Sequence, residues 1–284
     1  MLQEQGPTIW DRLLRVPRWV IYLIIAAAVI FPFLHPLRFP VEVSQRTRQL
    51  YDYIDKLPPG SVVCLAFDYG PSTMAELQPM AVAVTRHCFR NNLAVAGVAL
   101  DPWGAALCDA AFATANSDGK KKEHVDFVNL GYKTGYSAVI QGMGLNIHEV
   151  YKLDNRKTPV GDIPLMKNVR TYQDLAIVID LASSSTPQAW IAFAGARFGA
   201  TVSAGVTAVM ALDMYPYLQS GQLVGMLGGL KGAAEYEKLI NQPDQGALGM
   251  DSQNLAHGAI VLLVLLANLG YVVTRRQARR RQER

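Results

Sequence analysis

Residues 61–100 read SVVCLAFDYGPSTMAELQPMAVAVTRHCFRNNLAVAGVAL, and this stretch predicts a β-strand, an α-helix and a second β-strand in succession. Residues 61–67 and 93–100 are short, nearly continuous apolar runs, which are typical of strands buried on both faces. Between them, Thr73 and Glu76 have the spacing of a capping box, which predicts a helix that runs to about Arg90.

The same alternation continues along the chain. Further apolar runs follow at residues 125–130, 175–181 and 201–209. A helix is predicted from Thr186, because Pro187 then takes the first helical position. Residues 146–174 have little periodicity and indicate a long excursion between strands. We therefore expect a three-layer, Rossmann-like α/β domain with a mostly parallel sheet of about five strands.

Two further apolar runs lie near the ends of the chain, at residues 19–34 and 256–273. Both approach the length needed to cross a bilayer. In the first run Ala26, Ala27 and Ala28 lie mid-run, which favours an uncleaved signal anchor over a cleaved signal peptide. We expect an amphipathic interfacial segment (1–18), transmembrane helices at 19–37 and 256–273, a domain between them (38–255) and a basic tail (274–284).

Arginines after the second apolar run indicate the sidedness. Positive residues are retained on the cytoplasmic side of a membrane, whereas residues 241–255 contain no lysine or arginine. Two spans would place both termini in the cytoplasm of a cell-membrane protein and the central domain outside. The tail adjoins a span directly, so membrane lipid is its expected partner and nucleic acid is not. The arginines nearest the span are Arg275, Arg276, Arg279, Arg280 and Arg281.

The three cysteines Cys64, Cys88 and Cys108 are odd in number and have no C-x-x-C spacing. We interpret them as buried thiols. Free thiols are more usual in a reducing cytosol, so they stand against the outward placement of the domain.

Ligands of an open parallel sheet bind beyond the carboxyl ends of its strands, so the residues that follow each apolar run are the candidate binding residues. Lys133 and Thr134 follow one run. The others are Asp68, Tyr69, Ser72, Thr73, Asp101, Trp103, Asp180, Ser183, Ser184, Ser185 and Thr207.

Three aspartates in this set, Asp68, Asp101 and Asp180, could converge as oxygen ligands for Mg²⁺ or Ca²⁺. The commoner use of aspartate at a strand end is to cap a turn or a helix, and we favour that use here. We therefore predict no metal and no cofactor.

Motifs of the common enzyme classes are missing from the sequence. It contains no Walker phosphate loop, no dinucleotide fingerprint and no G-x-S-x-G nucleophile motif. A non-catalytic protein is therefore favoured, although a catalytic triad assembled from distant residues stays possible at this point.

The stretch GQLVGMLGGLKGAAEYEKLI, residues 221–240, places small residues at four-residue intervals. On one helix these residues would form a strip without side chains, open to close approach by a strand of the same domain or by a helix of another subunit. The strip consists of Gly221, Gly225, Gly229 and Ala233, with Gly228 and Gly232 beside them.

These observations favour a membrane-anchored, non-catalytic α/β binding or assembly module that self-associates or joins other subunits of a membrane complex. One alternative is an anchored hydrolase or metal-assisted transferase that acts at the strand ends. Another is an accessory subunit of a transporter.

Overall fold

A computed structural model describes residues 16–282 of the chain. It divides the chain into an α/β domain, Pro40–Ala247, and a helical unit formed by the segments before and after this domain. The two units are described separately below.

The α/β domain contains a six-stranded sheet in the order β3-β2-β1-β4-β5-β6, and every neighbouring pair of strands is parallel. The parallel sheet was predicted correctly, but one strand was missed. This strand, β6, is only three residues long and lies in the glycine-rich stretch, where no apolar run marks it. The strands are β1 (Val62–Asp68), β2 (Ala94–Ala99), β3 (Phe127–Tyr132), β4 (Ile177–Ala182), β5 (Val202–Val206) and β6 (Met226–Gly228).

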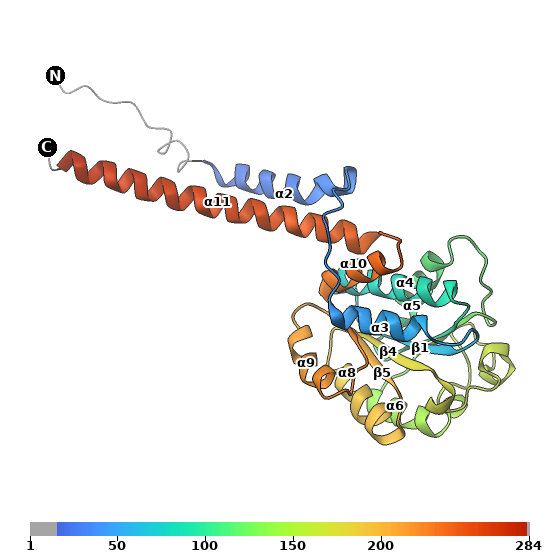
Figure 1. Ribbon diagram of the computed structural model, residues 1–284. Coiled ribbons are helices and arrows are strands. Elements are labelled where there is room, and N and C mark those ends of the chain that lie inside the picture. Colours follow the sequence, from blue (N-terminus) through green and yellow to red (C-terminus); the bar gives the residue numbers. More distant parts are fainter. Residues whose placement is uncertain (1–15, 283–284) are drawn as a thin grey trace. The chain divides into compact units, whose positions relative to one another are not determined.

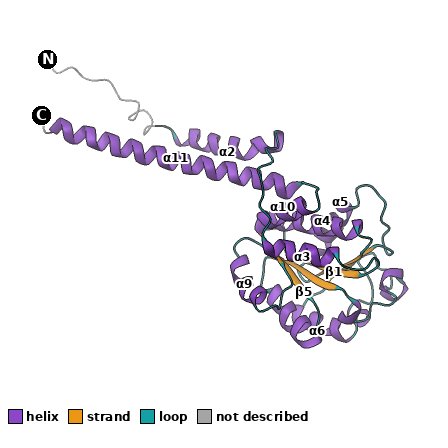
Figure 2. Cartoon of the chain, viewed as in Figure 1, coloured by secondary structure: helices purple, strands orange, loops and turns teal. Residues whose placement is uncertain are grey.

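Helices cover both faces of this sheet (Figures 1 and 2). One face carries α3 (Gln45–Asp55), α4 (Met74–Arg90), α5 (Gly104–Ala115) and α10 (Gly229–Leu239). The other carries α6 (Tyr136–Leu145), α8 (Thr186–Ala189), the π-helical segment η4 (Trp190–Ala196) and α9 (Ala211–Gln219). The three-layer arrangement was predicted from the alternation of strands and helices.

Strand β1 shows why the strands are mostly apolar. Its alternate side chains enter two different cores: Cys64 and Ala66 join one, and Leu65 and Phe67 join the other. Because both faces are buried, apolar side chains are favoured at both sets of positions.

The excursion between β3 and β4 packs on the domain. It contains the short helices α7 (Ile147–Val150), η1 (Val160–Asp162), η2 (Pro164–Met166) and η3 (Tyr172–Asp174). Tyr151, Ile163 and Tyr172 are buried in the same core as Cys64. The sequence of this excursion lacks a helical or strand periodicity because the backbone changes direction every few residues.

Helix α4 begins where the capping box was predicted, but no side-chain cap forms at Thr73. The Glu76 carboxylate instead accepts a hydrogen bond from the Ala208 N–H at 2.9 Å. This glutamate therefore ties the start of α4 to the loop that follows β5.

The helical unit contains α2 (Arg18–Leu34) and α11 (Gln245–Gln282). Among residues 16–282, only α11 contains a stretch long and apolar enough to cross a membrane, and only 6% of this apolar stretch is buried. The expectation of two such helices was therefore wrong, because α2 has 17 residues, about 26 Å at helical rise, and includes Pro32. Most of the predicted interfacial segment, residues 1–15, lies outside the described residues.

Contacts within this unit explain how far α2 extends beside α11 (Figure 1). The Ser252 hydroxyl donates to the Val29 carbonyl at 3.0 Å, and Asp251 accepts the N–H groups of residues 37–39 at 2.9–3.1 Å. The two helices run in opposite directions, and Arg18 lies 11 residues before Val29. Arg18 is therefore level with about residue 263, which is 11 residues after Ser252 and near the middle of the apolar run of α11. The expectation that both termini lie on one side of a membrane depended on two spans and loses its basis.

Residues 245–247, the first residues of α11, belong to the α/β domain, where a buried glutamate binds their backbone. The Glu237 carboxylate accepts the N–H groups of Asp244, Gly246 and Ala247, each at 2.8 Å. It therefore satisfies amide groups that the first turn of a helix leaves free. The helix begins well before the predicted domain boundary at residue 255.

Candidate functional site

The strand order reverses between β1 and β4, which lie at the centre of the sheet. The chain moves outward in one direction through β1, β2 and β3, and in the other through β4, β5 and β6. In open α/β sheets, ligands bind outside the carboxyl ends of the strands at such a reversal. The loops after β1 and β4 are therefore the first place to look for a site.

Asp68 ends β1 and lies below this reversal point, with 2% of its surface exposed. One carboxylate oxygen accepts the Leu100 N–H at 2.7 Å, and the other accepts the Trp190 indole N–H at 3.3 Å. Burial raises the pKa of Asp68 to about 6, against the smaller lowering effect of these hydrogen bonds. Asp68 therefore joins β1 to the end of β2 and to η4.

Asp180 on β4 is fully buried beside Asp68. The register pairs Asp180 with Ala66, so the two carboxyl groups point to the same face of the sheet. No residue from 16 to 282 forms a hydrogen bond of good geometry with either carboxyl oxygen of Asp180. Burial, followed by the charge of Asp68, raises the pKa of Asp180 well above its usual value. Burial and the neighbouring carboxylate therefore favour the protonated form of Asp180 over the ionised form.

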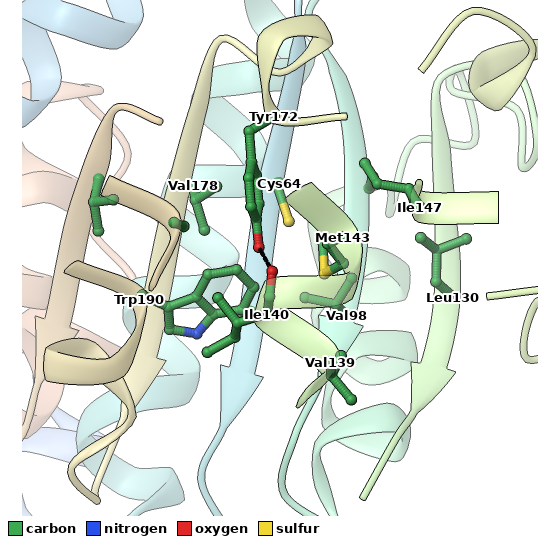
Figure 3. Close-up of a cluster of buried hydrophobic side chains, with 14 of the residues drawn as sticks. Cys64, Val98, Leu130, Val139, Ile140, Met143, Ile147, Tyr172, Val178 and Trp190 are labelled. Carbon is green, nitrogen blue, oxygen red and sulfur yellow. Dashed lines mark hydrogen bonds between the residues drawn. The ribbon is translucent and has the colours of Figure 1, made fainter. Parts of the chain in front are cut away.

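A layer of large side chains covers the face of the sheet to which the two aspartates point. Figure 3 shows three members of this layer, Trp190, Tyr172 and Cys64, and the Tyr172 hydroxyl, which donates to the Ile140 carbonyl at 2.6 Å. Trp190 and Tyr151 are fully buried in the same core. The layer separates both carboxyl groups from solvent, so a substrate in solution has no direct access to them.

Asp68, Asp101 and Asp180, which we weighed as possible metal ligands while favouring a capping role, do not form a shared metal-binding group. Asp101 is half-buried at the surface and accepts the Trp103 N–H at 2.9 Å, which is the capping role that we favoured. Among residues 16–282, no group of three histidine, cysteine or acidic side chains is arranged to hold a metal ion.

The other candidate binding residues lie around the carboxyl edge but form no shared polar site. The Ser183 N–H donates to the Asp68 carbonyl, and the Ser184 and Thr186 hydroxyls lie 3.3 Å apart. The Tyr69 hydroxyl is used within the domain, where it donates to Gln78. Ser72, Ser184 and Ser185 are exposed, Thr73 and Ser183 are half-buried, and Tyr69 and Thr207 are buried.

Nucleophilic chemistry has no support from the thiols. Cys64, Cys88 and Cys108 are unpaired and buried, as predicted. Burial raises the pKa of Cys88 to about 12, and it also raises the pKa values of Cys64 and Cys108. The thiolate, which is the reactive form, is therefore disfavoured at all three positions.

The glycine-rich stretch does not form one helical strip, so that expectation was wrong. Gly221 lies in a turn, Gly228 ends β6, and Gly229 begins α10. A Cβ atom on Gly225 would lie 2.5 Å from the Leu50 nitrogen in α3. Cβ atoms on Gly229 and Gly232 would likewise press on residues 208 and 227, and Ala233 is buried. The close approach that these residues permit is used inside the domain.

A surface feature that the sequence did not reveal is a group of exposed apolar side chains at the carboxyl edge. The loop after β1 meets the loop after β2 where Gly70 packs on Trp103, and Glu76 joins the start of α4 to Ala208. Four apolar side chains on these connected segments form what we call the apolar rim. They are Met74, Trp103, Val209 and Leu212, which are 42%, 60%, 86% and 72% exposed.

Comparison with known proteins identifies no matching family model, no matching curated protein and no matching solved structure.

Proposed function

We propose that the chain is a membrane-anchored, non-catalytic binding module that self-associates through the apolar rim. The observation that carries this proposal is the exposure of Met74, Trp103, Val209 and Leu212 on loops and helix starts that follow β1, β2 and β5. Grouped apolar exposure of this kind marks interaction surfaces on soluble domains. The burial of Asp68 and Asp180 behind Trp190 argues against the alternative of a hydrolase or metal-assisted transferase.

Anchoring is assigned to α11. The apolar side chains of its central part, including Val261, Leu265 and Leu269, are exposed. Lipid is a favourable surrounding for such a surface and water is not. Arg275, Arg276 and Arg279 follow the apolar run, so the proposal puts this end in the cytoplasm and residues 40–247 on the outer side of the cell membrane.

The rim is tested with a matched pair of leucine substitutions. Leu212 on α9 and Leu145 at the end of α6 are both 72% exposed. Leu145 lies at the opposite edge of the sheet, because α6 runs back from the carboxyl end of β3. Leu212→Gln removes apolar surface from the rim, and Leu145→Gln removes the same surface elsewhere.

The measurement is the native mass of the full chain in non-ionic detergent or nanodiscs over a range of protein concentrations. Burying a leucine contributes about 1.5–3 kcal/mol, so Leu212→Gln should weaken association at least about tenfold. Leu145→Gln should leave association unchanged. A wild-type chain that stays monomeric at all concentrations would refute the proposal, and so would equal effects of the two substitutions.

A further inference from the structure

A cavity of about 230 Å³ opens at the carboxyl end of β3, and none of its lining residues belongs to the apolar rim. One wall is the end of β3 and the residue after it, Leu130–Lys133. The other wall comes from the excursion between β3 and β4, and consists of residues 152–155 and Lys157. Its position outside a strand's carboxyl end is where α/β domains bind ligands.

Hydrogen bonds hold the two walls of this cavity together. The Asn155 N–H donates to the Asn129 carbonyl at 2.9 Å, which joins the excursion to β3. The buried Asn129 side chain donates to Asp109 at 2.8 Å, and Asn155 donates to the other oxygen of the same carboxylate at 3.1 Å. Gly131 has φ +85° where it passes Asn155. The cavity is thus shaped by the fold before any ligand arrives.

Three lysines, Lys133, Lys152 and Lys157, line the cavity, and none has an ion-pair partner among residues 16–282. Asp154 also lines it, but its carboxylate is already engaged. One oxygen accepts the N–H groups of Arg156 and Thr158, and the other pairs with His124 at 2.7 Å. The cavity therefore presents an uncompensated positive charge.

A second, larger basic cavity at the amino edge of the sheet differs in this respect. Three of its four cations, Arg86, Lys120 and Lys121, are paired with Asp244, Asp118 and Asp126. The fourth, Arg90, donates to the Ile240 carbonyl. Most of the positive charge is therefore neutralised at the amino edge, whereas no lysine of the cavity at the carboxyl end of β3 has an ion-pair partner among the described residues.

We infer that the cavity at the end of β3 binds a compact oxyanion with at least two negative charges, of the phosphate or small polycarboxylate class. Lysine ammonium groups act as point charges that bind such anions. The volume is below the roughly 300–1,000 Å³ of pockets for drug-sized ligands, which favours a compact anion over a nucleotide. This inference does not depend on self-association through the rim.

The test is isothermal titration of the full chain in non-ionic detergent at low salt, with inorganic pyrophosphate and with citrate as separate probes. We expect saturable binding of one anion per chain for at least one probe. Binding of pyrophosphate alone would assign the site to phosphates, and binding of citrate alone would assign it to polycarboxylates. Added sodium chloride should weaken the interaction by screening.

Lys152→Gln and Lys157→Asn should each weaken binding about tenfold, which corresponds to about 1.4 kcal/mol. Asparagine is chosen for Lys157 because this residue has φ +70°, a conformation that asparagine tolerates. Lys167→Gln is the control, because Lys167 is exposed and lines neither cavity. Thermal unfolding without ligand checks that each variant is folded.

Absence of saturable binding for both probes would overturn the inference. Affinities that are equal in the wild type and in folded variants of Lys152 and Lys157 would also overturn it.

Discussion

Asp180→Asn tests the buried carboxyl pair at the centre of the sheet. Asp180 lies beside Asp68, and its carboxyl oxygens form no hydrogen bond of good geometry among the described residues. An asparagine has nearly the same shape and carries its amide hydrogens at every pH. It can therefore donate to Asp68 permanently, as a protonated Asp180 does, without having to take up a proton on folding.

The magnitude follows from proton binding. In the folded chain at a pH above the Asp68 pKa of about 6, Asp68 is ionised, and we expect the raised pKa of Asp180 to keep that residue protonated. In the unfolded chain both aspartates have lost their protons above a pH of about 4. The folded state then holds one proton more than the unfolded state, so the free energy of unfolding falls by about 1.4 kcal/mol per pH unit.

The sign is set by the direction of the pKa shifts. Both folded-state values are raised, so stability is greatest below the unfolded pKa and is lost as pH rises. Between a pH of about 4 and about 6, Asp68 also holds a proton in the fold, and the slope approaches about 2.7 kcal/mol per unit. In Asp180→Asn residue 180 no longer binds or releases a proton. Its contribution to the change of the free energy of unfolding with pH therefore disappears.

The assay is guanidinium unfolding of the full chain in non-ionic detergent, followed by tryptophan fluorescence at pH 6.5, 7.5 and 8.5. We expect the variant to gain up to about 3 kcal/mol relative to the wild type across this range, from one proton over two pH units. The difference between the unfolding free energies of the variant and the wild type is free of contributions from groups that titrate equally in both chains. Asp162→Asn, which removes an exposed carboxyl on η1, controls for the loss of one acidic side chain. Parallel pH profiles for Asp180→Asn and the wild type would refute the reasoning.

Two other predictions concern packing and sidedness. Gly225→Ala should lower the free energy of unfolding by about 1–3 kcal/mol, because its Cβ would lie 2.5 Å from the Leu50 nitrogen and 2.8 Å from the Arg46 carbonyl oxygen, both of which are backbone atoms. Gly258→Ala, whose Cβ meets nothing within 4 Å, is the control, and equal unfolding free energies of the two variants would contradict the packing argument. Replacing the arginines of residues 275–281 with glutamine should disturb the orientation of the chain in the membrane, measured by cysteine labelling from each side. Unchanged sidedness would remove the support for a cytoplasmic tail.

The strands of the domain could be predicted from local patterns. Residues 61–67, 93–100 and 125–130 are mostly apolar because both faces of a covered parallel sheet are buried. The short strand β6 could not be predicted, since its three residues lie among glycines and acquire their conformation by pairing with β5.

Candidate site residues were predicted from their position directly after a strand. This position does not specify whether the side chain is buried or exposed. Asp68 and Asp101 both follow apolar runs, yet Asp68 is buried under Trp190 and Asp101 caps a surface turn. The difference comes from η4, a segment about 120 residues further along the chain, whose tryptophan packs over β1. The lysine cavity depends in the same way on an excursion that returns to the end of β3.

The alternation of strands and helices, the parallel sheet and the apolar length of α11 can be predicted from the sequence, because each depends on the pattern of side chains within a short segment. Long-range packing, in contrast, fixes which aspartates are buried, which glycines meet a backbone and which apolar side chains stay exposed. It also decided that α2 extends only part of the way along α11. These properties depend on atoms that are distant in sequence and brought together only by packing.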